Sequence, residues 1–118
     1  MHEVGSRQRS QPAPPHVVFE ALADPARDPV RPWLLLLDDE QPPELLDAEP
    51  DRLVWSSLWT DRPKDRIRFE ITSDGLSGSR LRRTLLAAGE LPTDQRLAQM
   101  RSRVNRLINA ELRYSLGQ

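Results

Sequence analysis

Cysteine is absent from the 118 residues of this chain. Its absence excludes a disulfide framework, a thiolate metal site and a cysteine nucleophile, and it is compatible with a reducing compartment. His2 and His16 are the only histidines and are not spaced as helical zinc ligands, so no metal site is expected. The length suits one domain with a moderate core, and we expect a single domain over residues 1–118.

Excess charge of one sign and long apolar runs are also missing. With 17 basic and 18 acidic residues the net charge is -1, so the long-range field expected of a nucleic-acid-binding protein is absent. The longest apolar run, residues 33–37, is far shorter than the ~20 residues needed to cross a bilayer. Residues 1–9 lack the apolar core of a signal peptide. We expect no nucleic-acid partner, no membrane span and a cytoplasmic location.

Motifs of catalysis are missing as well. The chain has no glycine-rich phosphate loop, no Gly-x-Ser-x-Gly elbow and no Ser/His/Asp grouping. Ser77 has no base beside it in the sequence and is not a credible nucleophile. Asp38, Asp39 and Glu40 lack the glycine and alternating oxygen ligands of a calcium loop, so a solvated turn is expected there. The sequence therefore predicts no catalytic residue and no cofactor.

Alternating patterns and turn residues predict an antiparallel sheet. The clearest strand covers residues 66–72, where alternation turns Ile67, Phe69 and Ile71 to one face and charged residues to the other. Further strands are expected at residues 4–10, 33–37, 44–48, 52–59 and 77–86. The first of them has no strong apolar face and suits a sheet edge, whereas residues 33–37 suit a buried strand.

Two helices complete the predicted fold. A short one is expected over residues 16–24, behind Pro15 and before Pro25, with a loop over residues 26–32. A long one is expected over residues 93–116, capped by Thr93 and ended by Gly117. Its apolar stripe comprises Leu97, Met100, Val104, Leu107, Ile108 and Leu112. The expected class is α+β, with the long helix packed along an antiparallel sheet.

Three segments resemble a known superfamily. Residues 12–25, PAPPHVVFEALADP, resemble the entry into the first helix of START-like (SRPBCC, helix-grip) proteins. Residues 50–55, PDRLVW, and residues 78–84, GSRLRRT, resemble two of its strands. These two segments look most like the Aha1-related group, with polyketide cyclase-like members next, and the resemblance spans nearly the whole chain. It implies a curved antiparallel sheet wrapped around a long C-terminal helix.

The resemblance also implies a cavity between sheet and helix for a lipid-like or aromatic compound. Superfamily members include carriers, cyclases and chaperone partners, so the fold leaves the function open. Noncatalytic binding of a hydrophobic small molecule is our first interpretation. The alternatives are a polyketide cyclase- or aromatase-like enzyme and an Aha1-like interaction module with a chaperone partner. A homodimer is also compatible with the sequence.

Candidates for lining the cavity are Trp33, Trp55, Trp59, Phe69, Arg83, Met100 and Val104. Aromatic rings and a thioether suit an apolar ligand, but the same side chains would equally fill a solid core. The guanidinium of Arg83, in an otherwise apolar row, could orient a carboxylate or phenolate, or polarise a carbonyl in the cyclase alternative. The default alternative is that Arg83 is solvated on a bulged or reversed strand. The sequence leaves both choices open.

Overall fold

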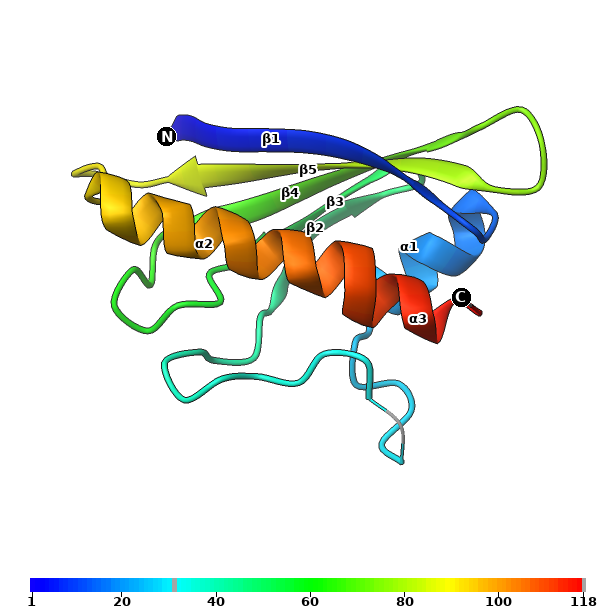
Figure 1. The fold of residues 1–118 in the computed structure, drawn as a ribbon, viewed down its shortest axis with the longest axis horizontal. Helices are drawn as coiled ribbons and strands as arrows, with labels where there is room; N and C mark the ends of the chain where they lie inside the picture. Colours follow the sequence, from blue (N-terminus) through cyan, green and yellow to red (C-terminus); the bar gives the residue numbers. More distant parts are fainter. Residues whose placement is uncertain (31, 118) are drawn as a thin grey trace.

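The computed structural model describes residues 1–30 and 32–117 and is α+β (Figure 1). Arg31, within the loop expected over residues 26–32, and Gln118 lie outside the described residues. The elements are, in chain order, β1 (His2–Gln11), α1 (Pro15–Ala23), β2 (Leu45–Glu49), β3 (Arg52–Ser56), β4 (Arg66–Ser73), β5 (Ser79–Ala87), α2 (Asp94–Arg106), the π-helical η1 (Leu107–Leu112) and α3 (Arg113–Ser115).

The strands form one antiparallel sheet in the order β1-β5-β4-β3-β2. Consecutive strands β2 to β5 make a meander, and β1 crosses over to pair with β5, which confirms the predicted edge position of the first strand. A bulge between Glu3 and Gly5 shifts the β1 register. The C-terminal helix lies across the sheet, close to β1 for much of its length (Figure 1).

The predicted alternation in β4 and β5 is confirmed. Ile67, Phe69 and Ile71 are 2% exposed or less. The inward row of β5 comprises Ser79, Leu81, Arg83 and Leu85, all of them buried. Gly75 has φ +84° in the turn between the two strands, a conformation that L side chains rarely adopt. Alternation therefore predicted the inward face of β4, and the structure shows that the row of β5 that contains Arg83 also faces inward.

Helix α1 is tied to the core by two indole groups. Pro15 occupies its first turn, and Val18 and Leu22 are fully buried. The indole nitrogen of Trp55 donates to the carbonyl oxygen of Leu22 at 2.7 Å, and that of Trp33 donates to Ala21 at 2.9 Å. These bonds satisfy carbonyl groups at the C-terminal end of the helix, which have no partner within it.

The C-terminal helix follows the predicted path but is not regular throughout. Thr93 caps α2 by accepting a hydrogen bond from the backbone N–H of Arg96 at 3.1 Å, as expected. Five of the six residues of the predicted stripe, Met100, Val104, Leu107, Ile108 and Leu112, are buried in the core, whereas Leu97 near the start of the helix is half-buried. The expectation of one regular α-helix over residues 93–116 is wrong at residues 107–112, which are π-helical. The wider turn brings Leu107 and Leu112, five positions apart, to the same buried face.

The predicted buried strand over residues 33–37 is wrong. This run lies in the segment of residues 24–44 between α1 and β2, hereafter the connection, and its residues 33–37 form no strand. Trp33 is buried, but Leu35 and Leu37 are 61% and 53% exposed. Nearby prolines lack the backbone donor that a sheet ladder needs, and an apolar run without alternation carries no information about which face is buried.

The strand predicted over residues 52–59 ends earlier, at Ser56. The hydroxyl of Ser57 accepts a hydrogen bond from the backbone N–H of Trp59 at 3.0 Å, which turns the chain out of the strand. Trp59 remains 2% exposed and forms a single bridge with Glu40 of the connection. All the residues predicted to share one face here, Leu53, Trp55, Ser57 and Trp59, are buried.

Candidate functional site

The apolar candidates come together in one packed cluster beneath the C-terminal helix. Trp55, Trp59, Phe69, Met100 and Val104 are each 2% exposed or less, and Trp33 is 9% exposed. The ring of Trp55 stacks on Trp33 with centroids 6.0 Å apart and meets Phe69 edge to face at 4.8 Å. The three rings therefore form a continuous row from the connection to the middle of the sheet.

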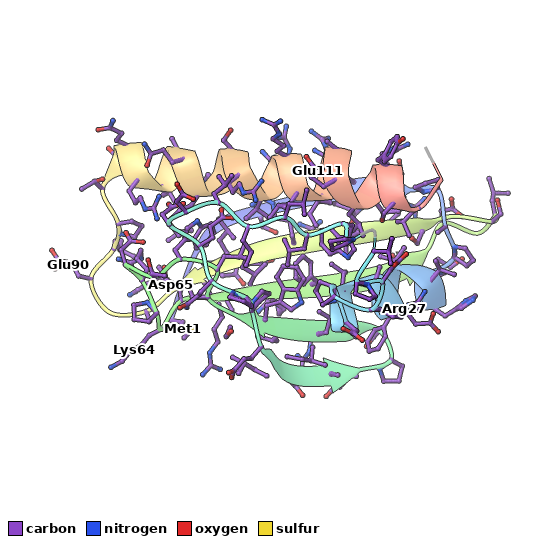
Figure 2. All side chains as sticks on the ribbon, turned by 90° about the horizontal axis from the view of Figure 1, so that it is seen from below. Met1, Arg27, Lys64, Asp65, Glu90 and Glu111 are labelled. Carbon is purple, nitrogen blue, oxygen red and sulfur yellow. The ribbon has the colours of Figure 1, made fainter. Side chains whose placement is uncertain are left out.

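Pockets open around the connection, at the outer end of this row. The most apolar has a volume of about 310 Å³ and is lined by Ala23, Asp24, Pro25, Ala26, Pro32, Leu34, Leu36, Pro42 and Pro43. Trp33 borders two others, of about 200 and 550 Å³, beside the end of the C-terminal helix. A groove of about 770 Å³ between the connection and α2 includes Leu35 and Leu37. Figure 2 shows the connection running alongside the helix.

Trp33 is the sequence-predicted candidate that borders these pockets. The other candidates, Trp55, Trp59, Phe69, Arg83, Met100 and Val104, lie deeper and line none of the pockets just described. Sequence reasoning missed the apolar pocket because its wall is built from prolines and leucines of a segment interpreted as turns and a strand. The unusual density of proline at residues 25–43 was the available signal.

Arg83 points inward, against the default expectation of solvation. It is 4% exposed and lies opposite Phe69 on β4 and Arg7 on β1. One terminal nitrogen, Nη2, donates to the side-chain oxygen of Asn105 on α2. Nε and Nη1 are buried without a hydrogen-bond partner. Burial, together with the positive charges of Arg7, Arg101 and Arg9, lowers the pKa of Arg83 to about 10, so the group stays charged at neutral pH.

A buried ion pair closes the connection onto the helix. Arg103 of α2 donates from Nε and Nη2 to the carboxylate of Glu40, at 2.8 and 2.9 Å, and also to the carbonyl of Leu35 at 2.7 Å. The Glu40 side chain is 1% exposed, so the expected solvated turn is wrong for this residue. Glu40 stands at the end of an acidic run, and nothing in the sequence predicted that it would pair with an arginine 63 positions later.

A second arginine of α2 adds to this closure. Arg96 contacts Asp61 at 2.8 Å and Asp39 of the connection at 3.5 Å. The hydrogen bond from Arg96 is the main cause that lowers the pKa of Asp61. At the end of the sheet near the start of α2, Arg62 pairs with the buried Asp65 and donates to the carbonyls of Ala88 and Glu90 (Figure 2).

Within the described residues, no three His, Asp or Glu side chains are grouped as a metal site would require. None of the described helices combines the length and apolar character needed to span a membrane. Among the described residues, Asn105 accepts a hydrogen bond from Arg83, and Arg7, Arg101 and Arg9 act on its charge. None of these four side chains is a base at neutral pH.

No protein-family model matches the chain, and no curated protein matches it. Solved structures do. CalU16 from Micromonospora echinospora superposes with a TM-score of 0.70 at 18% identity, covering 95% of this chain and 73% of that one. The Aha1 dimer from Colwellia psychrerythraea gives 0.69 at 14% identity, covering 98% and 96%. Ara h 8.0201 gives 0.53 at 16% identity, covering 99% of both chains. These likenesses show that the chain has the helix-grip fold, which the resemblance of its three segments implied.

Proposed function

We propose that this chain is a noncatalytic binding protein for a hydrophobic small molecule, lipid-like or aromatic. The observation that carries the proposal is the apolar pocket between the end of α1 and the connection. Apart from Asp24, every residue that lines it is alanine, proline or leucine. A wall of this composition favours apolar ligands, because it removes their surface from water without leaving polar groups unpaired.

The size of the pocket also supports a small ligand. Its volume of about 310 Å³ lies at the lower end of the range of ligand sites, roughly 300–1,000 Å³. Leu36, one of its walls, is 36% exposed, and neighbouring Leu35 and Leu37 are more exposed. A ligand in the pocket would cover leucine surface that water now contacts. Removing apolar surface from water stabilises a complex by about 25 cal/mol per Å².

The deeper candidates, Trp55, Trp59, Phe69, Arg83, Met100 and Val104, remain part of the proposal as an inner site. Trp33, itself a residue of the connection, is the outermost ring of the aromatic row, and Trp55 and Phe69 lie behind it. A rotation of the Trp33 indole would open a path from the outer pockets to the space between sheet and helix. Its bond to the Ala21 carbonyl is the hydrogen bond that such a rotation would break.

Methyl-labelled protein titrated with dodecanoate and with a flavonoid tests the proposal by NMR. Saturable shifts at Leu34 and Leu36 are expected for the outer pocket, and at Met100 and Val104 for the inner site. Leu36→Asp should weaken binding about tenfold or more, because a charge in an apolar wall must be desolvated. Leu76→Asp is the matched control, since Leu76 is 88% exposed in the β4–β5 turn. Absence of saturable binding by any apolar probe would refute the function.

The two alternatives predict different results with the same samples. A cyclase-like enzyme needs a general base near the polarised carbonyl, and the described groups around Arg83 supply none. A protein-interaction module or homodimer would place the exposed leucines of the connection at an interface. Sedimentation at increasing protein concentration records a dimer directly, and Leu35→Asp should dissociate it if this surface is used.

A further inference from the structure

Four arginines gather where β1 meets α2, and we call this region the seam. Its four arginines, the seam arginines, are Arg7, Arg9, Arg83 and Arg101. Arg7 is the cross-strand partner of Arg83, and Arg9 is two positions further along the same face of β1. Arg101 reaches over from α2 and donates from Nε to the carbonyl of Val4 at 2.8 Å. Two strands and a helix thus bring positive charge to one place.

Two of these guanidinium groups converge above Gly5. A Cβ at this position would lie 2.9 Å from Nε of Arg101 and 3.4 Å from Nη1 of Arg83. Because glycine has no side chain, the Arg101 side chain can lie directly over the backbone here, close to Arg83. Arg101 donates from both Nε and Nη2 to the carbonyl of Val4, which holds its charge beside Arg83.

Two of the three side-chain nitrogens of Arg83 are not used by the protein. Nε and Nη1 are buried and have no hydrogen-bond partner, and Asn105 takes only Nη2. Further along the seam, Gln11 and its cross-strand partner Ser79 are also buried with unpaired side-chain polar atoms. Buried donors are normally satisfied, because an unpaired one costs about 1–3 kcal/mol and more when it is charged.

A counter-charge is missing as well. In the part of the chain that the structure describes, no carboxylate forms an ion pair with any seam arginine. Elsewhere the same chain pairs its arginines readily, as it does for Arg27, Arg52, Arg62, Arg68, Arg96, Arg103 and Arg106. The seam therefore holds clustered like charges, one of them buried, with nothing to neutralise them.

We infer that the seam is an anion-binding site, in which Arg83 with Arg101, Arg7 and Arg9 holds the carboxylate or phosphate group of a small molecule. The oxyanion accepts hydrogen bonds from Nε and Nη1 of Arg83 and neutralises the cluster. Phe69, beside Arg83 on β4, provides apolar contact for the carbon atoms next to the anionic group. The site shares Arg83 and Phe69 with the inner site of the proposed function and in that part rests on it, but it shares no lining residue with the apolar pocket.

The test uses the whole chain, labelled with ¹⁵N, and two probes in parallel, inorganic phosphate and decanoate. Sodium chloride at matched ionic strength serves as the reference. We expect saturable shifts of the Arg83 Nε–H and Gly5 amide signals, and a higher unfolding temperature than in chloride, because an anion that binds only the folded state stabilises it. A response to phosphate alone identifies a phosphorylated ligand, and a response to both identifies a general oxyanion site.

Three variants separate binding from a structural role. Arg83→Met should lose about tenfold or more in affinity for the probe. It should not unfold more easily than the wild type in chloride, since it removes an uncompensated buried charge. Arg80→Met, on the exposed face of the same strand, should bind as the wild type does. Gly5→Ala, whose Cβ would push Arg101 away from Arg83, should weaken binding even if Arg83→Met does not fold.

Specific results would overturn the inference. One is the absence of a saturable shift at Arg83 and Gly5 with either probe beyond the chloride reference. Another is undiminished affinity in both Arg83→Met and Gly5→Ala. Decanoate that shifts only Leu34 and Leu36 would support the apolar pocket and contradict the seam site, so failure here is distinguishable from failure of the proposed function.

Discussion

On the side of α2 that faces the connection, arginines meet carboxylates. Arg103 binds the buried Glu40, and Arg96 binds Asp61 and Asp39. On the side that faces β1, Arg101 contacts a backbone carbonyl and stands beside Arg83, and no described carboxylate pairs with either. Arg101 and Arg103 are two positions apart, so an α-helix directs them roughly 200° apart, to opposite sides.

This difference is not caused by a shortage of acidic residues, because the chain has 18 of them for 17 basic ones. We call the side of α2 that carries Arg96 and Arg103 the paired side. It holds the connection in place, and carboxylates of the protein neutralise both arginines. The seam leaves its charges to be neutralised by something that is not part of the protein. Pairing thus separates arginines that stabilise the structure from arginines that are available to a ligand.

Breaking the paired side should have the largest effect on stability. Glu40→Ala leaves Arg103 partly buried without its carboxylate, and we expect a loss of about 3 kcal/mol in the free energy of unfolding. Urea unfolding measures it. Asp38→Ala, two residues away and exposed, should change stability by less than about 0.5 kcal/mol. Equal effects of the two substitutions would mean that the buried pair does not stabilise the connection.

The sequence predicted those parts of the molecule whose pattern is local. Alternation in residues 66–72 and the stripe from Met100 to Leu112 each identify a buried face without knowledge of the partner. The run at residues 33–37 has no such pattern, so the solvent exposure of its leucines could not be predicted. Glu40 was missed because its partner, Arg103, is 63 positions away and only the folded chain brings them together.

Arg83 shows the limit for the candidate site. Alternation placed it in one row with Leu81 and Leu85 but left solvation of Arg83 as the default expectation, and the structure shows instead that it is buried. The neighbours that give it meaning come from two elements far from β5 in the sequence: Arg7 from β1, and Arg101 and Asn105 from α2. A residue's face could be predicted, but the charges gathered around it depend on β1 crossing over to pair with β5.

Supplying a carboxylate to the seam should make it resemble the paired side. Arg7→Glu places an acidic group directly opposite Arg83, and we expect stabilisation of about 1 kcal/mol, measured by urea unfolding. Phosphate binding at the seam should be lost at the same time. Gln8→Glu makes a charge change of the same sign on the exposed face, opposite Arg82, and should change stability less and leave phosphate binding intact. A destabilised Arg7→Glu variant would contradict the view that the seam lacks only negative charge.

The smallest effect on stability is expected from the exposed ion pair between Arg96 and Asp61. Arg96 lowers the pKa of Asp61 below 3.8, so the folded state favours the charged carboxylate. The stabilisation is therefore complete well above pH 3.8 and is lost as pH falls through the lowered value. Because Asp61 is 55% exposed, solvent screening limits it to a few tenths of a kcal/mol.

Thermal unfolding of Asp61→Asn against the wild type at several pH values tests this. We expect a small deficit in the variant from pH 5 to pH 8 that shrinks as pH falls below 3.8 and disappears below the lowered pKa of Asp61, where protonated Asp61 and asparagine are both neutral. Arg83 should give no such pH dependence in this range, since its pKa of about 10 keeps it charged throughout. A deficit that does not shrink as pH falls below 3.8 would assign the Asp61 contribution to hydrogen-bond geometry and not to charge, and would weaken the contrast between the two sides of α2 at its most exposed pair.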